Sequence, residues 1–335
     1  MSKQILVTGG LGYIGSHTLV ALVEAGYTPV IIDNLVNSNR GVLKRLESIC
    51  NQELPFYEFD ILDTEQLKST LEKHSIQAVI HFAAFKAVGE SVQMPLKYYE
   101  NNVGGIISLL KAMDNQGVNH LVFSSSCTVY GEPDELPVTE ETPMKPATSP
   151  YGATKQMGEQ ILEDGKPRVI ALRYFNPIGA HESAQIGEMP LGIPSNLIPY
   201  VTQTAIGKRD QLTVNGDDYP TKDGTNIRDY IHVMDLAEAH VAAIKRQEKD
   251  AKDFEVFNIG TGQGNSVLEV LKTFEEVNKL KLNYKMGPRR DGDVMQVYAD
   301  VSKANKILGW KHQRTLQDSL RSAWKWEQFA ANLPS

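Results

Sequence analysis

The stretch SPYGATK holds a tyrosine and a lysine four residues apart, Tyr151 and Lys155, just behind a proline. Ser149 is a favourable helix N-cap and Pro150 a favourable first helical residue, so the sequence predicts that a helix begins here. Residues four apart share one face of a helix, which would place a phenol beside an ammonium and could form an acid–base pair. An exposed helical pair without chemistry is the alternative, because this spacing is common.

A glycine-rich stretch near the N-terminus, VTGGLGYIGS, adds a second component. It fits the pattern Gly9-x-x-Gly12-x-x-Gly15 and, counted from Gly10, the pattern GxGxxG. It also follows an apolar run and precedes a helical stretch. In that position glycines permit a tight turn and let backbone N–H groups approach a pyrophosphate at the helix N-terminus. A merely structural turn is the alternative, but the context favours a dinucleotide site.

Two carboxylates follow later apolar runs. Asp33 lies 18 residues after Gly15, where it can accept hydrogen bonds from the hydroxyls of an adenosine ribose. Because its charge would repel a 2′-phosphate, it favours NAD over NADP; a solvated turn residue is the alternative. Asp60 could meet the adenine amino group, and its alternative is a helix N-cap or a loop carboxylate.

The elements that must position these residues follow from the hydrophobic pattern, in which short β-branched runs alternate with stretches of helical length. This alternation predicts right-handed βαβ units, and hence an α/β fold with a Rossmann-type doubly wound parallel sheet. Buried parallel strands are predicted at residues 4–8, 28–33, 55–59, 77–82, 120–125 and 168–174. Helices are predicted at residues 13–25, 64–74, 95–116 and 149–163.

The chain has 335 residues, which exceeds the usual size of one domain. In its second half proline, glycine and polar loops become more frequent. A Rossmann domain at 1–175 and a smaller C-terminal α/β substrate lobe at 176–335 are therefore expected. Segments near 228–262 are expected to return to the first domain, because 228–246 has the pattern of a helix and 254–260 that of a buried strand.

The composition argues against several kinds of partner. A net charge of −7 disfavours nucleic acid and anionic membranes, both of which require a basic surface. No apolar run could cross a bilayer and MSKQILVTGG lacks the features of a signal peptide, so a cytoplasmic location is expected. Cys50 and Cys127 are expected to be reduced, buried packing residues. His232 and His240 are expected on one side of a helix without further ligands, so no metal is expected.

Taken together, the motifs resemble those of the extended short-chain dehydrogenase/reductase family, over essentially the whole chain. The resemblance is closest to the branch that epimerises UDP-hexoses at C4. It rests on GGLGYIGSH, DNLVNS, HFAAFKAVGES, SSSCTVYG, SPYGATK, LRYFNPIGAH, DGTNIRDYIHVMDLAEAH and RRDGDV, in this order. It implies a reaction that interconverts UDP-galactose and UDP-glucose through a 4-keto sugar, with a tightly held NAD that is regenerated rather than consumed.

The resemblance also implies the roles of three residues. Tyr151 would remove the proton of the 4-hydroxyl, Lys155 would bind the nicotinamide ribose, and Ser126 would hydrogen-bond the 4-hydroxyl. A tyrosine that acts as a base near neutrality needs its pKa lowered by about three units from its usual value near 10. We expect the Lys155 ammonium, the positive nicotinamide ring and the helix N-terminus to lower the pKa of Tyr151.

Further binding residues are assigned by the same resemblance. The cofactor-binding residues are Gly9, Gly12, Tyr13, Ile14, Gly15, Asp33, Asn34, Asn37, Ser38, Asp60, Ile61, Phe82, Ala83, Lys86, Asn101, Ser124, Tyr151, Lys155 and Phe175. The residues that bind the UDP-hexose substrate are Lys86, Ser126, Tyr151, Asn176, Asn196, Leu197, Asn215, Arg228, Arg290, Asp293 and Val297.

The charges in this substrate set have a physical rationale. By resemblance Arg228 and Arg290 grip the diphosphate, for which the planar guanidinium fork is suited, and Asp293 binds the uridine ribose. An ordinary loop charge is the alternative for Arg290, and a turn residue before proline is the alternative for Asn176.

Two positions depart from the family pattern. Val297 stands where many members have tyrosine. In members with a small residue at this position, the site has room for an N-acetyl group at C2 of the sugar. The enzyme is therefore expected to accept UDP-GlcNAc and UDP-GalNAc as well, unless Tyr298 or a shifted loop fills the space. Asn215 replaces an aromatic residue often found near the uracil, which leaves that contact open.

Two other functions share many of these features. A nucleotide-sugar 4,6-dehydratase needs a further acid–base pair, usually Asp-Glu, where this chain has Cys127 and Thr128. A catalytically silent NAD-sensing protein would generally lack Tyr151 or Lys155. In relatives the helices equivalent to 95–116 and to the one beginning at 149 meet their symmetry mates in a four-helix interface, so a homodimer is expected.

Overall fold

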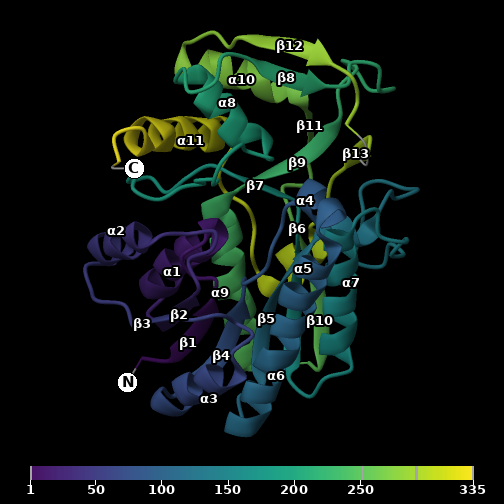
Figure 1. Cartoon of the computed structure of the whole chain (residues 1–335). Coiled ribbons are helices and arrows are strands. Elements are labelled where there is room, and N and C mark those ends of the chain that lie inside the picture. Colours follow the sequence, from purple (N-terminus) through teal and green to yellow (C-terminus); the bar gives the residue numbers. More distant parts are fainter. Residues whose placement is uncertain (1, 251, 291–292, 334–335) are drawn as a thin grey trace.

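The main element of the fold is a seven-stranded parallel sheet with the strand order β10-β6-β5-β4-β1-β2-β3 (Figure 1). The computed structural model describes residues 2–250, 252–290 and 293–333. The strand order reverses between β1 and β4, which creates the crevice where doubly wound sheets bind nucleotides. The strands are β1 (Gln4–Thr8), β2 (Thr28–Asp33), β3 (Phe56–Glu58), β4 (Ile76–His81), β5 (His120–Ser126), β6 (Arg168–Tyr174) and β10 (Phe254–Ile259).

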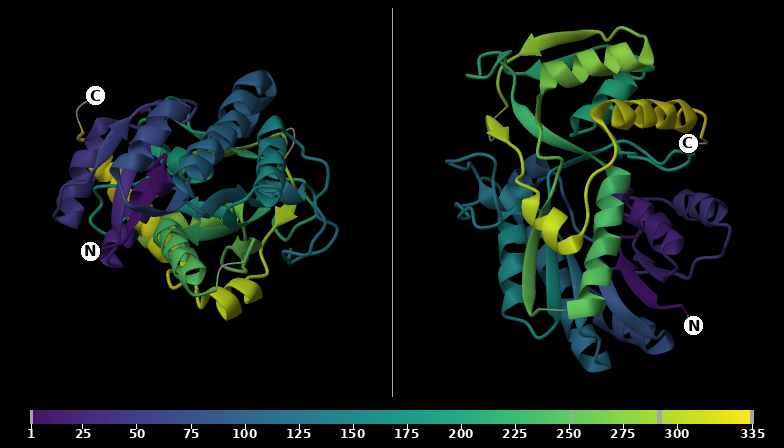
Figure 2. Two further views of the ribbon diagram at one scale, coloured as in Figure 1. Left: turned by 90° about the horizontal axis from the view of Figure 1, so that it is seen from below. Right: turned by 180° about the vertical axis from the view of Figure 1, so that it is seen from behind.

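Helices cover both faces of this sheet and bury two separate apolar cores (Figure 2). Successive strand residues point to opposite faces, so Ile5 and Val7 enter one core and Leu6 the other. The first core is closed by α1 (Tyr13–Glu24), α2 (Arg40–Cys50) and α9 (Val233–Asp250). The second is closed by α3 (Thr64–Lys73), α6 (Gly104–Gln116) and α7 (Pro150–Glu163). The predicted Rossmann-type architecture is confirmed.

The helix predicted at 95–116 is interrupted by a π-helical turn. α4 (Val88–Gln93) and α5 (Pro95–Tyr98) lead into this turn, η1 (Tyr99–Val103), which continues into α6. Such turns are frequent near functional sites. Asn102 in this turn is buried and bonds both backbone groups of Phe85 and the hydroxyl of Thr154, at distances of 2.9 to 3.0 Å. It therefore ties the loop after β4 to α7.

A smaller lobe sits above the carboxyl ends of the strands (Figure 1). It has its own apolar core, which includes Phe274 and Leu320. Its sheets are β11-β9-β13, with β7 also paired to β9, and the pair β12-β8. Its strands are β7 (Asn176–Ile178), β8 (Leu212–Asn215), β9 (Ile227–His232), β11 (Gly264–Ser266), β12 (Tyr284–Gly287) and β13 (Gln296–Val297). Its helices are α8 (Leu197–Ala205), α10 (Val267–Asn278) and α11 (Leu316–Ala330).

The prediction of one helix over 228–246 is wrong in its first part. Ile227–His232 form the strand β9, and the helix begins only at Val233. The reason is tertiary, because β9 pairs with β7, β11 and β13, which come from distant parts of the sequence. His232 and His240 therefore lie on different elements and not on one helix.

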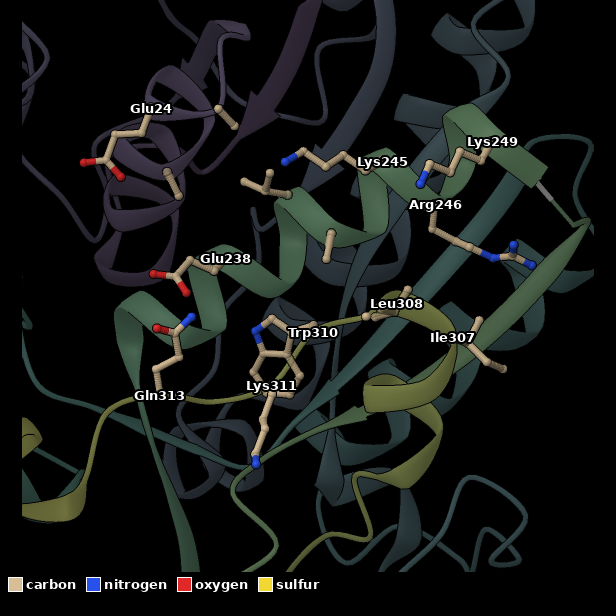
Figure 3. Close-up of a pocket in the computed structure, with 15 residues that line it drawn as sticks. Glu24, Glu238, Lys245, Arg246, Lys249, Ile307, Leu308, Trp310, Lys311 and Gln313 are labelled. Atoms are coloured by element: carbon tan, nitrogen blue, oxygen red, sulfur yellow. The ribbon is translucent and has the colours of Figure 1, made fainter.

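A cavity of about 570 Å³ lies between α1, α9 and the segment around η3 (Ala304–Leu308) (Figure 3). Its lining includes Trp310, Lys245 and Glu238, and none of the predicted site residues belongs to the described lining. It therefore lies away from the nucleotide crevice of the sheet.

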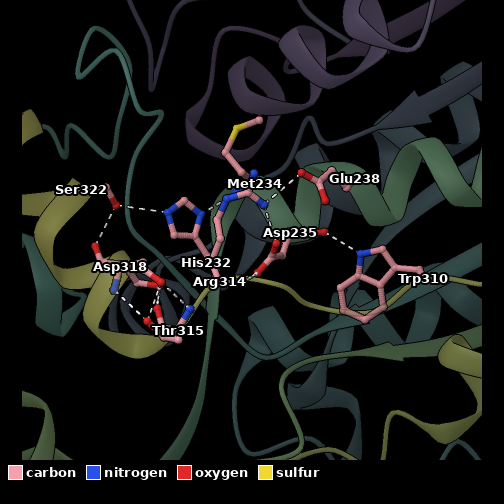
Figure 4. Close-up of polar contacts among 10 residues, drawn as sticks. His232, Met234, Asp235, Glu238, Trp310, Arg314, Thr315, Asp318 and Ser322 are labelled. Carbon is pink, nitrogen blue, oxygen red and sulfur yellow. Dashed lines mark hydrogen bonds and ion pairs between the residues drawn. The ribbon is translucent and has the colours of Figure 1, made fainter.

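The segment after this cavity is anchored to the start of α9 (Figure 4). The fully buried Asp235 carboxylate accepts from the backbone N–H of Arg314 and from its guanidinium, at 3.0 and 2.5 Å. The indole of Trp310 donates to the carbonyl of Asp235 at 2.9 Å. His232 contacts the Ser322 hydroxyl of α11 at 3.2 Å. These contacts fix the lobe to the helix that packs on the main sheet.

Among the helices described, none combines the length and apolar character that crossing a bilayer would need. Within residues 2–250, 252–290 and 293–333, no three His, Cys, Asp or Glu side chains group so that they could hold a metal ion. His240 instead bonds the hydroxyl of Tyr174 and the carbonyl of Leu236.

Candidate active site

The glycine-rich turn runs from the end of β1 into α1 and lies against the end of β4. Gly9 has a φ of +69°, and a Cβ there would lie 2.8 Å from the backbone nitrogen of Ala83. A Cβ at Gly15 would collide with the carbonyl oxygen of Gly9. Gly12 is the N-cap residue of α1. The turn is thus packed so closely that only glycines fit, which leaves backbone N–H groups and the helix N-terminus facing a ligand.

Asp33 and Asp60 lie at neighbouring strand ends beside this turn. Asp33 is buried and accepts hydrogen bonds from Leu11 N at 3.0 Å, Leu35 N at 2.9 Å and Ser38 Oγ at 2.8 Å. Asp60 accepts from the Asn34 amide at 2.8 Å and is not a helix N-cap, since that place is taken by Asp63. The structure therefore brings together most of the residues predicted to bind the adenosine half.

The Tyr-Lys helix begins as predicted. Ser149 caps α7 by accepting from Gly152 N at 3.2 Å, and Pro150 is the first helical residue. Lys155 is only 4% exposed, and its ammonium donates to the carbonyl of Ser124 at 2.5 Å. The ammonium lies 5.9 Å from the ring centroid of Tyr151. The alternative of an exposed helical pair is therefore wrong.

The pKa values of these two groups differ from expectation in one respect. Burial raises the pKa of Tyr151 to about 12, and the hydrogen bond with Ser126 offsets only part of that rise. In the protein's own surroundings burial therefore outweighs the groups that favour the phenolate, and the net lowering expected together with the positive nicotinamide ring stays a prediction. Burial also lowers the pKa of Lys155 to about 8, against the attraction of the Glu159 carboxylate, which raises it. Both shifts have the same cause, which is the exclusion of water.

Two residues predicted separately to bind the substrate, Lys86 and Asn196, meet at Glu188, which was not predicted. The carboxylate of Glu188 accepts from Lys86 Nζ at 2.9 Å and from the Asn196 amide at 2.6 Å. The Lys86 ammonium also lies 6.0 Å from the ring centroid of Tyr13. Glu188 lies in a loop with no regular spacing to these partners, so no local pattern in the sequence could have indicated it.

The predicted substrate residues of the lobe gather around β9 and β13. Arg228 and Val297 are neighbours in the β9–β13 ladder, and the Arg290 guanidinium pairs with Asp293 at 2.7 Å. Asn176 begins β7, and its side-chain oxygen is buried without a hydrogen-bond partner among the residues that the structure describes. A buried unpaired acceptor is costly unless a ligand supplies a donor. These residues therefore form a polar rim that is suited to a ligand.

Other predicted residues occupy the periphery of this rim. Asn215 is exposed at the end of β8, whereas the ring of Tyr219, which the sequence analysis did not identify, lies 4.1 Å from the Arg289 guanidinium. Most of the remaining predicted residues lie at strand or helix ends along the same edge. These are Tyr13, Ile14, Asn37, Ile61, Phe82, Asn101, Ser124, Phe175 and Leu197.

The positions that a dehydratase would use for its extra acid–base pair hold no acid. Cys127 is a half-buried free thiol whose pKa burial raises to about 12, and Thr128 Oγ1 is buried without a partner. Cys50 is also a half-buried free thiol and packs against the first core. Cys127 packs against the small core that contains Val129 and Val297, so both cysteines do pack, but the prediction that they are buried is wrong.

Comparison with known proteins gives a consistent family. A family model described as GDP-mannose 4,6 dehydratase matches residues 6–323. The chain is 53% identical to a UDP-glucose 4-epimerase of Neisseria meningitidis serogroup B over 97% of both chains, and 51% identical to that of Bacillus subtilis over 98% of both. The structure of UDP-glucose 4-epimerase from Bifidobacterium longum in complex with NAD+ and UDP matches with a TM-score of 0.95 and 46% identity, covering 98% of this chain and 99% of that one.

The shifted pKa of Lys155 predicts a cost to stability. Its folded value of about 8 lies below the usual 10.5, so the charged form is disfavoured by folding. This loss of folding stability is fully present below pH 8, and it disappears as the pH rises from 8 toward 10.5. In protein stripped of nucleotide, Lys155→Met should therefore raise the free energy of unfolding at pH 7 by about 2 kcal/mol, after allowance for one lost hydrogen bond.

Urea unfolding at pH 7 and pH 10.5 measures this effect. The gain should shrink at the higher pH, whereas Lys44→Met on the exposed side of α2 should change stability by less than about 0.5 kcal/mol at both. A Lys155→Met protein that is less stable than the parent at pH 7 would contradict the assignment.

Proposed function

Because this chain belongs to the UDP-glucose 4-epimerases, within the extended short-chain dehydrogenase/reductases, we propose that Tyr151, Lys155 and Ser126 carry out the proton transfers of its reaction. That reaction is the NAD-dependent epimerisation of a UDP-hexose at C4, which interconverts UDP-galactose and UDP-glucose through a 4-keto sugar. The observation that carries the proposal is the meeting of a buried ammonium, a phenol and a serine hydroxyl at the carboxyl edge of the sheet.

The residues present fit NAD. The glycine turn leaves no room for a Cβ at Gly9, and Asp33 ends β2 where it can accept from the adenosine ribose. Lys155 is the residue that would hold the nicotinamide ribose. When bound, NAD+ supplies reversible hydride transfer to and from C4 of the sugar, and its ring carries a positive charge.

Tyr151 handles the proton of the 4-hydroxyl. Its phenolate accepts the proton from O4 as C4 is oxidised, and the phenol returns it when the 4-keto sugar is reduced from its other face. Ser126, which bonds Tyr151, is placed to share the same oxygen. Because burial alone raises the pKa of Tyr151, the phenolate depends on nearby positive charge, of which Lys155 is the protein's own source.

The rim around β9 and β13 is proposed to bind the UDP group. Arg228 and Arg290 would take the diphosphate, and Arg290 would then exchange part of its pairing with Asp293 for phosphate oxygens. The unpaired oxygen of Asn176 would accept from the ligand. In this assignment residues 1–175 bind NAD and 176–335 bind the UDP-sugar, with segments near 228–262 returning to the first unit.

Two alternatives are less well supported. A 4,6-dehydratase requires an acid where this chain has Cys127 and Thr128, although the matching family model carries that name. A silent NAD-sensing protein has no need of the intact pair Tyr151 and Lys155. The free thiols of Cys50 and Cys127 agree with a reducing location, and we propose that the enzyme is cytoplasmic.

Tyr151→Phe tests the proposed base. The substitution removes one hydroxyl, so epimerisation of UDP-galactose should fall at least about 100-fold, in line with the loss of a general base. Bound NAD, measured after denaturation, should stay near one per chain because the glycine turn and Asp33 are untouched. A variant that keeps its turnover would overturn the role of Tyr151, and Tyr99→Phe, at a half-buried tyrosine outside the proposed site, serves as control.

The small residue at Val297 supports a wider substrate range. Val297 lies on β13 and packs with Phe175 and Ala299, so the position holds no bulky ring. The ring of Tyr298 lies against Gly264 on β11 and so does not replace the missing tyrosine. We therefore propose that UDP-GlcNAc and UDP-GalNAc are also epimerised.

Val297→Tyr should narrow this range by filling the space beside C2. The ratio of kcat/KM for UDP-GalNAc to that for UDP-galactose should fall at least about tenfold, as expected for a steric clash in a substrate pocket. Val297→Ala, which enlarges the space, should leave the ratio equal or higher. No detectable turnover of UDP-GalNAc by the parent enzyme would sink the wider specificity.

A homodimer is proposed from an apolar surface on α4 to α7. These helices pack side by side and expose large apolar side chains to a degree unusual for a free surface, with Leu96 at 79%. The side chains concerned are Val92, Met94, Leu96, Ile107 and Met157.

Light scattering should accordingly give twice the chain mass of 37.2 kDa. Met157→Glu should shift the protein toward the monomer, because a charge would be buried in the interface. The control Ile307→Glu lies on η3, away from this surface, and should leave the mass unchanged. A parent protein with the mass of one chain would refute the dimer.

A further inference from the structure

A buried ion pair lies directly behind the catalytic residues. Glu159 and Arg173 have side chains only 3% and 4% exposed, and they meet in a two-pronged contact. Glu159 Oε1 accepts from Arg173 Nε at 3.0 Å, and Oε2 accepts from Nη2 at 2.6 Å. Such a pair is expensive to bury, and its presence calls for a reason beyond stability.

The pair connects the two elements that carry the proposed chemistry. Glu159 lies one helical turn after Lys155 on α7, and its Oε1 also accepts from the hydroxyl of Ser125 at 2.5 Å. Ser125 stands on β5 between Ser124, whose carbonyl accepts from Lys155, and Ser126. Glu159 therefore fastens α7 to the part of β5 that holds the two partners of Lys155 and Tyr151.

Arg173 is held in place from its other side. It pairs with Ser125 in the β5–β6 ladder, and its Nη1 donates to the Tyr130 hydroxyl at 3.0 Å. That hydroxyl donates to the Asn258 side chain on β10 at 2.6 Å. The carboxylate of Glu159 is thus fixed by groups from β5, β6 and β10, and cannot swing away from Lys155.

The charges around Lys155 are few. The titratable groups that face it, among the described residues, are His81 on β4 and Tyr151 and Glu159 on α7, with Arg173 behind Glu159. Burial and the charge of Lys155 lower the pKa of His81 to about 3, so His81 is neutral. Among the described groups at this place, Glu159 is the acidic side chain, and although it pairs with Arg173 and not directly with Lys155, its charge raises the pKa of the ammonium.

We infer that Glu159 is a positioning residue of the epimerase. It keeps α7 in register with the end of β5, and it holds Lys155 in its ammonium form beside Tyr151. Arg173 serves this role by fixing the carboxylate. The inference rests on the proposed roles of Tyr151 and Lys155.

Glu159→Gln keeps the shape of the side chain and removes its charge. Its kcat for UDP-galactose at pH 7 should fall at least tenfold, while KM changes less than threefold, because Glu159 is not among the residues proposed to bind the UDP-hexose. The alkaline limb of the kcat profile should move to lower pH by about one unit, since an ammonium without its counter-charge loses its proton more easily. The exposed Glu163→Gln, one turn further along α7, should leave both quantities unchanged.

A second measurement separates this inference from the proposed function. The pH at which Lys155 loses its proton can be followed by NMR of the labelled lysine Cε, assigned with Lys155→Met, whether or not the chain epimerises anything. It should fall by about one unit in Glu159→Gln. An unchanged value would overturn the inference even if the parent is active, whereas an inactive parent with the expected shift would count only against the proposed function.

A double variant addresses a purely structural role. Glu159→Met with Arg173→Met replaces the ion pair by apolar side chains of similar size, which often preserves stability. Its melting temperature should stay near that of the parent, while kcat remains at least tenfold lower. Recovery of kcat to within threefold of the parent would show that Glu159 serves only to neutralise Arg173.

Discussion

Burial of the Lys155 ammonium is the constraint on which the geometry of the site depends. A cation with 4% exposure loses most of its hydration, which costs several kcal/mol unless other groups replace the water. The carbonyl of Ser124 and the ring of Phe123 at 5.0 Å replace the water, and the charge of the Glu159 carboxylate favours the ammonium without a direct contact. All three come from β5 or α7, so the ammonium is tolerated only when these two elements meet in one register.

The parts of the fold that carry this register were largely predictable. Fully buried parallel strands consist of short β-branched runs, and β1, β2 and β6 begin and end where those runs do. The start of α7 was visible in its cap, because Ser149 and Pro150 act on their immediate neighbours in sequence. Local chemistry of this kind does not depend on distant parts of the chain.

What escaped prediction depends on partners that are distant in sequence. β9 was assigned to a helix because its strand character comes from pairing with β7, β11 and β13. The pKa of Tyr151 was expected to fall because the charge of Lys155 is visible in the sequence, whereas the burial that raises this pKa is not. The spacing of Lys155 and Glu159 could have suggested a contact, but Arg173 arrives from another strand.

The connection between the lobe and the main sheet limits how the 4-keto sugar could present both of its faces to the nicotinamide of NAD. Arg228 lies on β9, which runs without a break into α9, and α9 packs on α1 beside the main sheet. The proposed diphosphate anchor and Tyr151 are therefore held in one frame that rigid packing keeps at fixed separation. If neither end can move, the rotation has to occur in the hexose itself. Binding energy is then best placed on the UDP group, which agrees with the position of Arg228 and Arg290 on the lobe.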